Sequence, residues 1–384
     1  MIAARQIFLG RGGAKLPYDA EVEYLESTGT QWIDTGVSIS DASLADVTWN
    51  VEVVNYNDGC MGAFGSGSYV SMYFNLYANK FYMRNMRTSG GSFTGVSGFN
   101  TVRFSGGNSY LNGTAVETEI PLNTNPVHTM YLFAYNRNGT TTGFCKARVS
   151  SFIVKKNGVT VCDFIPVRVG SEGAMYDRVS KQLFRNQGTG VFGYGNDVVE
   201  VEYLESTGTQ YIDTGRPIPT DFWFDATIDI AGTDNTYKTL LGARIASGNH
   251  DYQFSFQGAN NNFLARYGTS NSQYFASRQT GMTRIRVDSG GKLYINESFV
   301  IQLGVDSPPE ILNMYIFWLN NNGVGSQAAK YIRVYSLKFG GTNESHDLIP
   351  VRVGMEGAMK DTLTRRFYHN AGTGNFSYGA DKAS

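Results

Sequence analysis

Paired carboxylates are the first residues in this sequence that could do chemistry. A glycoside hydrolase needs two of them about 5–9.5 Å apart. Glu21, Glu23 and Glu26 lie close together, but no aspartate sits among them. Asp225 and Asp229 share a strand face if that strand is regular, yet the corresponding stretch near 46–51 does not repeat the pair. We therefore expect no enzyme, and we keep a glycoside hydrolase only as the third alternative.

Other catalytic patterns are missing from the sequence. His128, His250, His346 and His369 lack the spacing of zinc ligands. The string GRGGAK at 10–15 is rich in glycine, but it has neither P-loop spacing nor a preceding strand. Nucleophilic triads are also absent, so the sequence predicts neither a zinc site nor a phosphate-binding loop.

Aromatic and amide side chains indicate carbohydrate binding as the remaining chemistry. Sugars stack on aromatic rings and form hydrogen bonds with Asn, Gln, Asp and Arg. In YVSMYFNLY the polar and apolar residues alternate, which would direct the tyrosines to one outer face. Two Asn- and Gly-rich loops are candidates at the rim. The candidate carbohydrate-binding residues are Tyr69, Tyr73, Asn75, Tyr77, Asn136, Arg137, Asn320 and Asn322.

The outer face of the tyrosine strand has a second interpretation. A second sheet or the neighbouring domain would cover these rings and leave no open platform. The matching strand in the other half of the chain, YQFSFQ, would direct Tyr252, Phe254 and Phe256 inward. Its predicted outward residues are Gln253, Ser255 and Gln257.

Composition excludes several classes of protein. The 384 residues contain 32 Lys and Arg against 33 Asp and Glu, so the chain lacks the basic footprint of a nucleic-acid binder. No apolar run approaches the roughly 18–20 residues that span a bilayer. The apolar run at Ile7–Leu9 is too short for a secretory signal. We expect neither nucleic acid nor membrane as a partner.

An internal repeat sets the organisation of the chain. VEYLESTGTQWIDTG at 22–36 returns as VEYLESTGTQYIDTG at 201–215. FIPVRVGSEGAMYDRVSKQLFRNQGTGVFGYG at 164–195 returns as LIPVRVGMEGAMKDTLTRRFYHNAGTGNFSYG at 348–379. We predict an N-terminal arm over 1–20, a first domain over 21–196 and a second over 197–384.

The period of two within each copy predicts strands. Expected strands include residues 45–54, 101–104, 131–135 and 148–154, with partners at 222–230, 284–287, 315–319 and 332–339. Asn112-Gly113 and Asn157-Gly158 indicate tight turns. No stretch has a convincing helical period. The predicted fold class is all-β, with two tandem antiparallel β-sandwich domains of the jelly-roll kind.

Cysteine usage fits this arrangement. Cys60, Cys145 and Cys162 all lie in the first copy, and three cysteines do not make a disulfide framework. We expect small buried residues. A bridge between Cys145 and Cys162 and a reactive thiol are the alternatives.

The paired motifs carry a family resemblance. EYLESTGTQWIDTG, followed by GAMYDRVSKQLFRNQGTG, resembles the concanavalin A-like lectin/glucanase superfamily. More narrowly, it is similar to laminin-G-like jelly-roll modules of gut bacteria and their phages and prophages. The resemblance covers nearly the whole chain, twice. It implies that the opening and closing strands of each domain are neighbours. Laminarinase-type members carry E-x-D-x-x-E, which is absent here.

The resemblance also raises calcium, which some laminin-G modules bind at the sandwich rim. The repeated aspartates are the candidates, although Ca²⁺ needs six to eight oxygens and no dense acidic loop supplies them. We expect no cofactor, with Ca²⁺ as the alternative. In the simpler interpretation each aspartate caps its own turn. The residues are Asp34, Asp213, Asp177 and Asp361.

These features predict a non-catalytic structural or attachment protein of a phage or prophage particle: a decoration, fibre or tail-associated component of the virion that contacts surface polysaccharide. The basic arm, ARQIFLGRGGAKLPY, would be either a disordered leader or a segment that docks onto other virion or surface-assembly proteins. We also expect a homo-oligomer. The alternative is a bacterial lectin or adhesin located on the cell surface.

Overall fold

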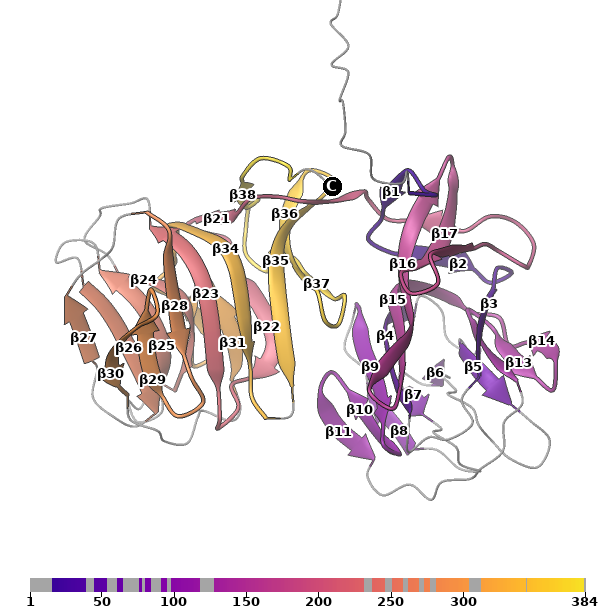
Figure 1. Cartoon of the computed structure of the whole chain (residues 1–384), viewed down its shortest axis with the longest axis horizontal. Helices are drawn as coiled ribbons and strands as arrows, with labels where there is room; N and C mark the ends of the chain where they lie inside the picture. The colour runs from indigo at the N-terminus through magenta and orange to yellow at the C-terminus, as the bar shows by residue number, and fades with distance from the viewer. Residues whose placement is uncertain are drawn as a thin grey trace, which may run out of the picture.

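The computed structural model describes residues 16–38, 45–53, 61–64, 76–77, 80–83, 91–94, 98–117, 128–230, 237–245, 251–257, 262–268, 273–276, 281–303, 312–342 and 344–382. These residues form strands, turns and loops with no helix, and they build two β-sandwiches that lie side by side (Figure 1). This confirms the predicted all-β fold class with two antiparallel sandwiches. No described segment forms a helix long and apolar enough to cross a membrane.

The first sandwich packs a large sheet of order β11-β10-β9-β4-β15-β16-β17-β18, with β1, β2 and β19 attached, against a sheet of order β14-β13-β5-β12-β3. A third sheet contains β6, β7 and β8. The bounds are β1 Ala20–Glu21, β2 Leu25–Thr28, β3 Ile33–Ser38, β4 Ala45–Val53, β5 Met61–Phe64, β6 Leu76–Tyr77, β7 Lys80–Met83, β8 Gly91–Thr94, β9 Asn100–Ser105, β10 Asn108–Leu111, β11 Thr114–Glu117, β12 Thr129–Leu132, β13 Tyr135–Arg137, β14 Thr140–Thr142, β15 Lys146–Lys156, β16 Val159–Val169, β17 Glu172–Asp177, β18 Gln182–Phe184 and β19 Gly193–Tyr194.

The second sandwich repeats this plan. Its large sheet has the order β30-β29-β28-β23-β34-β35-β36-β37, with β20, β21 and β38 attached, and its other sheet the order β22-β31-β24-β25-β26-β27, with β32 and β33 attached. The bounds are β20 Val198–Glu200, β21 Leu204–Thr207, β22 Ile212–Pro217, β23 Trp223–Ile230, β24 Tyr237–Arg244, β25 Asp251–Gln257, β26 Asn262–Gly268, β27 Gln273–Ala276, β28 Thr283–Val287, β29 Lys292–Ile295, β30 Ser298–Gln302, β31 Asn313–Ile316, β32 Leu319–Asn321, β33 Val324–Ser326, β34 Lys330–Gly340, β35 Ser345–Val353, β36 Glu356–Asp361, β37 Phe367–Tyr368 and β38 Ser377–Tyr378.

Alternating sequence explains why each large sheet buries one face. In β23, WFDATIDI, every second residue is buried, and Phe224, Ala226 and Ile228 are fully enclosed. In β4 the equivalent core residue Trp49 is stacked on Phe104 at 5.3 Å between ring centroids. Each sandwich therefore has its own apolar core, because one face of every central strand turns away from water.

The opening and closing motifs of each sandwich are paired, as the resemblance implied. β19 pairs with β2, and β38 pairs with β21. The Asn186 side-chain oxygen accepts hydrogen bonds from the backbone N–H of Trp32 (3.1 Å) and of Gly188 (2.8 Å). Asn370 does the same for Tyr211 and Gly372.

Two expected strands are interrupted. The predicted strand over 131–135 breaks into β12 and β13 at Phe133, and that over 315–319 breaks into β31 and β32 at Phe317. Both phenylalanines adopt left-handed backbone angles (φ 64° and 69°) and are completely buried. The break allows each phenylalanine ring to enter the core. Residue periodicity does not predict such a break.

The outer face predicted for β25 is also corrected. Gln253 and Ser255 were expected to point into solvent, but both are fully buried. Ser255 shares a hydrogen bond of 2.8 Å with Thr239, and Gln253 donates one of 2.7 Å to Ser255. Gln327, from the segment after β33, completes this polar cluster by accepting from Gln253. The segment covers the face, so its polar residues satisfy one another instead of facing water.

Cysteines follow the main expectation in one respect and depart from it in another. Cys162 is a free thiol, buried in the first core, and burial raises its pKa. Cys145 is disulfide-bonded. The alternative of a bridge between these two residues is therefore wrong. Cys60 lies outside the described residues.

The described end of the predicted arm packs on its own sandwich. β1 pairs with β16, and the Tyr18 ring lies 5.0 Å from that of Tyr176. The joint between the sandwiches is fixed as well: Asp197 bridges to Val22 and pairs with Arg168 at 2.9 Å. This short, bonded joint holds the two sandwiches in a definite relation.

Candidate functional site

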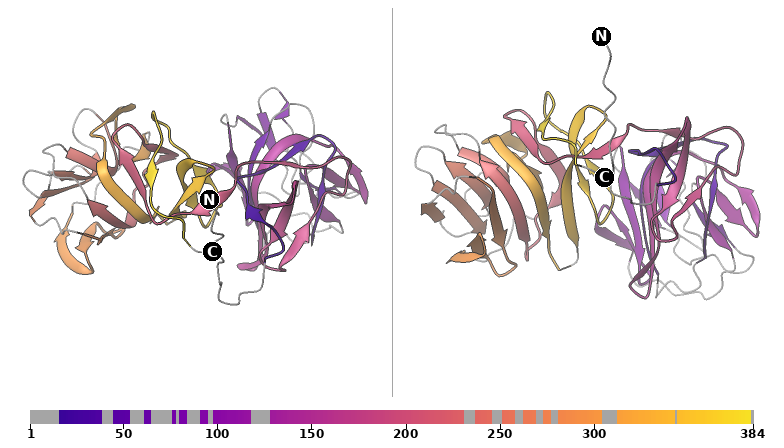
Figure 2. Two further views of the ribbon diagram at one scale, coloured as in Figure 1. Left: turned by 90° about the horizontal axis from the view of Figure 1, so that it is seen from above. Right: turned by 45° about the horizontal axis from the view of Figure 1, so that its top comes forward.

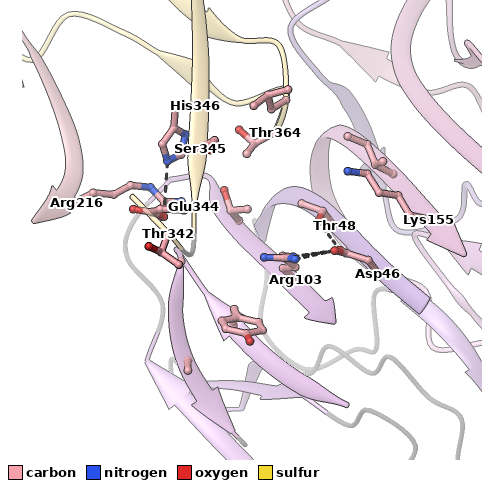
Figure 3. A pocket seen from close by; sticks show the side chains of 16 residues that line it. Asp46, Thr48, Arg103, Lys155, Arg216, Thr342, Glu344, Ser345, His346 and Thr364 are labelled. Atoms are coloured by element: carbon pink, nitrogen blue, oxygen red, sulfur yellow. Dashed lines mark hydrogen bonds and ion pairs between the residues drawn. The ribbon is translucent and has the colours of Figure 1, made fainter. Parts of the chain in front are cut away.

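A polar cleft of about 800 Å³ lies between the two sandwiches. Strands β4, β9 and β10 contribute to its wall from the first sandwich, and β22, β35 and the β36–β37 turn contribute from the second (Figure 3). Its volume falls within the roughly 300–1,000 Å³ of ligand-binding pockets. We take this cleft as the candidate functional site.

The wall from the first sandwich carries an ion pair beside an aromatic ring. The Arg103 guanidinium donates to both oxygens of Asp46, with Nη2 2.7 Å from Oδ2 and Nε 3.1 Å from Oδ1. Cross-strand register places Arg103 between Thr48 and Tyr110, and its Cζ lies 5.5 Å from the Tyr110 ring centroid. The Asp46 hydrogen bond raises the pKa of Arg103, so the guanidinium on this wall stays charged.

The wall from the second sandwich carries a buried chain of charges. His346 Nδ1 lies 2.7 Å from Asp361 Oδ2, and Nε2 lies 3.7 Å from Glu344 Oε2. Glu344 in turn pairs with Arg216, which is 7% exposed. Figure 3 shows His346, Glu344 and Arg216 in sequence along this wall.

Burial is the largest influence on the pKa of His346 and would lower it, but Asp361 and Glu344 together outweigh burial and raise it. The same contacts act on the acids. Burial alone would raise the pKa of Glu344 and Asp361, and the attraction to His346 lowers both. The network therefore favours an imidazolium between two carboxylates.

One turn of the second sandwich holds the two walls of the cleft in place by contacting the first sandwich. Residues 361–366, between β36 and β37, rest on the large sheet of the first sandwich, next to β4 and β9 in Figure 1. The Thr364 carbonyl accepts hydrogen bonds from Asn50 Nδ2 and from Ser151 Oγ (3.2 Å). Arg365 Nη2 lies 2.9 Å from Asp163 Oδ2. Figure 2 shows the closing strands of the second sandwich, in yellow, against the first sandwich.

Two flanking ion pairs extend the contact. Lys360 pairs with Glu21, and His369 Nε2 lies 3.0 Å from Glu23 Oε1. Glu21 and Glu23, two of the three clustered glutamates considered in the sequence, are therefore engaged in joining the sandwiches.

Among the described residues, the carboxyl groups with shifted pKa values all favour the ionised form. A carboxyl group acts as a general acid at neutral pH only when its pKa is raised. Wherever a described aspartate or glutamate has a shifted pKa, the shift is downward; these residues are Asp177, Asp221, Glu344, Asp361 and Asp381. Acids of this kind stay ionised and form ion pairs or cap turns.

The rim residues predicted to bind carbohydrate divide into two groups. Asn136 is buried, donates to the Thr129 carbonyl (3.0 Å) and accepts from Gly139 N–H (2.8 Å). Asn320 makes the same pair of bonds in the second sandwich. Both amides therefore serve their own hairpins. Arg137 and Asn322 are exposed.

The structure does not describe the tyrosine side chains that were predicted to form a stacking face. Tyr69, Tyr73 and Asn75 lie outside the described residues, as does the side chain of Tyr77. Their role as a stacking face stays a prediction, and neither Asn136 nor Asn320 lines the cleft.

The calcium candidates all cap turns. Asp34 accepts from Gly36 N–H at 2.9 Å, and Asp213 accepts from Gly215 N–H at 2.8 Å. Asp177 accepts from the backbone of β16 and of its own turn, and the equivalent Asp361 does the same. Within the described part of the chain no three His, Cys, Asp or Glu side chains gather in a way that could hold a metal ion.

The cleft residues were missed by sequence reasoning, although a signal was present. Arg103 lies seven residues before Tyr110, and Arg286 lies eight before Tyr294. Both pairs form a cation–aromatic contact, the second at 4.1 Å. The repeated Arg and Tyr predict a cross-strand pair. Only the packing of the two sandwiches decides that the first pair faces a cleft.

No protein-family model matches the sequence, and no curated protein does. Among solved structures, the mouse laminin alpha1 chain, domains LG4-5, is similar over 88% of this chain and 94% of that chain. The identity is 11% and the TM-score is 0.28, so no functional conclusion follows from this likeness.

Proposed function

We propose that this chain is a non-catalytic attachment protein that holds a surface glycan in the cleft between its two sandwiches. The observation that carries the proposal is the cleft wall formed by Asp46, Arg103 and Tyr110. An aromatic ring beside a paired acid and base offers stacking together with hydrogen-bond donors and acceptors, which is the combination that sugars require.

Charge pairing supports a polar ligand over a strongly charged one. Arg103 is neutralised by Asp46, and Arg216 by Glu344. Hydroxyl groups of Thr48, among others, add further hydrogen-bonding capacity to the wall. A ligand rich in hydroxyl groups therefore fits these paired walls, to which Lys155 adds one exposed cation.

Glycan-array binding of the wild-type chain and of Tyr110→Ala tests the proposal. Losing the stacking ring should weaken binding about tenfold, which corresponds to the ~1.4 kcal/mol expected of one aromatic contact. Tyr294→Ala is the matched control, because Tyr294 has the same arginine contact but does not line the cleft. No binding by the wild-type chain, or equal losses in both variants, would refute the glycan site.

The absence of catalysis is tested separately. Incubation with the glycans that bind should release no reducing ends above the background rate. Release at enzymatic rates would replace the attachment role with hydrolysis.

A virion is the setting that we propose for this attachment role, as a decoration, fibre or tail-associated component. The low charge, the Gly- and Asn-rich composition and the basic arm support it. Mass spectrometry of purified phage particles should then detect the chain at a constant stoichiometry. Its recovery in the cell-envelope fraction alone would exclude a virion component.

A bacterial cell-surface lectin or adhesin is the second candidate. The disulfide at Cys145 favours it, because disulfides persist mainly in oxidising compartments outside the cytosol. Alkylation of the protein after denaturation without reductant separates the two settings, because Cys145 is buried in the folded chain. Protection of Cys145 favours the exported protein, and labelling of Cys145 favours assembly in the cytosol.

A further inference from the structure

The two sandwiches of one chain meet where the turn at 361–366 docks onto the first sandwich, which we call the closed contact. An equivalent turn and an equivalent patch occur a second time in the chain. In the closed contact, the Thr364 carbonyl accepts from Asn50 and Ser151, and Arg365 pairs with Asp163 at 2.9 Å. Asn50 and Ser151 are fully buried there. A turn of one sandwich thus covers a polar patch on the large sheet of the other.

The second sandwich carries an equivalent patch in the same register, with Arg284 facing Thr227 where Thr101 faces Asn50. Asn50 faces Ser151 across β4 and β15, and Thr227 faces Ser336 across β23 and β34. Asp347 follows on β35, where Asp163 lies on β16. Thr227, Ser336 and Asp347 are only half-buried, consistent with a patch that this chain leaves uncovered.

The first sandwich carries the same turn in the same conformation. Asp177 caps residues 177–182 as Asp361 caps 361–366. Lys181 takes the place of Arg365, and both have left-handed backbone angles (φ 61° and 64°). The residues from Arg178 to Gln182 are all exposed. A turn built like the docked one therefore projects into solvent.

We propose that the turn at 177–182 of one copy docks onto the patch of Thr227, Ser336 and Asp347 on a second copy, so that chains associate head to tail. Lys181 is the cation that pairs with Asp347, and the Ser180 carbonyl accepts from Thr227 and Ser336. This interface is separate from the glycan cleft and does not depend on it.

The partner cation already at the patch does not block docking. Lys338 Nζ lies 3.1 Å from Asp347 Oδ2 and is half-exposed. In the closed contact Asp163 also serves two cations, with Arg178 at 3.7 Å and Arg365 at 2.9 Å. One carboxylate shared by two basic groups is therefore how this contact is already made.

Head-to-tail docking has a definite consequence for assembly. The docking turn and the receiving patch belong to different sandwiches, so the contact is heterologous and not self-complementary. Each copy offers one free turn and one free patch. Repetition gives a ring if the rotation between copies closes, and a filament if it does not.

Cross-linking of mixed variants tests the geometry. Ser180→Cys and Ser336→Cys are prepared as separate full-length chains and treated with a short bismaleimide, alone and in a 1:1 mixture. Only the mixture should give a cross-linked dimer, because the two positions meet only between different copies. Dimers from either variant alone, or none from the mixture, would overturn the proposal.

Analytical ultracentrifugation tests the ion pair. The wild-type chain should associate with increasing concentration, and Lys181→Glu should weaken association about tenfold or more. Lys181→Arg keeps the charge and should retain association, which separates the ion pair from damage to the turn. Circular dichroism checks that both variants fold. A wild-type chain that stays monomeric at high concentration would contradict the interface.

Discussion

At the scale of single residues, the contrast between Cys162 and His346 is informative. The repeat aligns these two positions, and both side chains are buried beside a turn-capping aspartate. In the first sandwich the position holds a thiol whose pKa burial raises. In the second it holds an imidazole between Asp361 and Glu344. The same fold position therefore holds a buried thiol in one sandwich and a charged link in the other.

This link makes stability depend on pH in a predictable direction. The folded-state pKa of His346 is raised above its ordinary 6.5, so its contribution is complete below that pH and is lost as pH rises through the raised value. The pKa values of Glu344 and Asp361 are lowered from 4.5 and 3.8. Their contributions are complete above those values and are lost as pH falls through the lowered ones. The network stabilises most at about pH 4.5–6.5.

The prediction is a decline in melting temperature as the pH rises above about 6.5, and a reduced slope in His346→Gln. Glutamine still donates a hydrogen bond to Asp361 but does not titrate. Thermal unfolding across a buffer series measures the slope. Identical slopes in wild type and His346→Gln would show that the network does not titrate as described.

At the scale of elements, the repeated motifs stabilise the closure of each sandwich. NQGTG and NAGTG run beside TQW and TQY through backbone hydrogen bonds, such as Gln187 N–H to the Trp32 carbonyl at 2.9 Å. A Cβ placed on Gly188 would lie 2.0 Å from the Thr30 carbonyl oxygen, and one on Gly372 would lie 2.0 Å from that of Thr209. Close backbone approach therefore explains why both copies have glycine here.

Gly188→Ala and Gly372→Ala should each destabilise the protein by about 2–3 kcal/mol, because the added methyl group must displace backbone. Gly193→Ala is the matched control, since its Cβ would meet Glu26 Cβ at an ordinary 3.5 Å. Urea unfolding of the three variants measures the difference. Losses as large in the control as in the two test variants would mean that closure does not depend on this approach.

At the scale of the whole molecule, the docked turn couples the two sandwiches. Arg365 and Asp163 are 13% and 14% exposed, so their ion pair is largely shielded from solvent. Removing one partner leaves the other charge poorly compensated, which typically costs about 2–5 kcal/mol at an interface. The relative position of the sandwiches, and with it the shape of the cleft, depends on this contact.

Arg365→Ala should therefore uncouple the sandwiches and separate their unfolding into two calorimetric transitions. Lys181→Ala, at the equivalent exposed position, should leave the wild-type profile unchanged at concentrations where the chain is monomeric. The comparison isolates the docked turn, since both substitutions remove one cation from the same turn conformation. An unaltered profile for Arg365→Ala would place the coupling elsewhere.

The sequence by itself determined the elements and the internal repeat. Alternation at every second residue specified strands such as β23 and β4, and Asn-Gly pairs specified tight turns with left-handed angles, as at Asn112 (φ 51°) and Asn157 (φ 51°). These features are local, because side-chain direction in a strand and backbone angles in a turn depend on adjacent residues. The family resemblance of the motif pair implied that opening and closing strands meet, and they do.

Only the tertiary structure decided which polar faces are open. Gln253 and Ser255 have the sequence pattern of an exposed face, yet the segment containing Gln327 covers them. Arg103 and Tyr110 have the pattern of an ordinary cross-strand pair, yet they line the cleft. Burial of a polar side chain depends on segments distant in the sequence that pack over it, and alternation within a single strand carries no information about them.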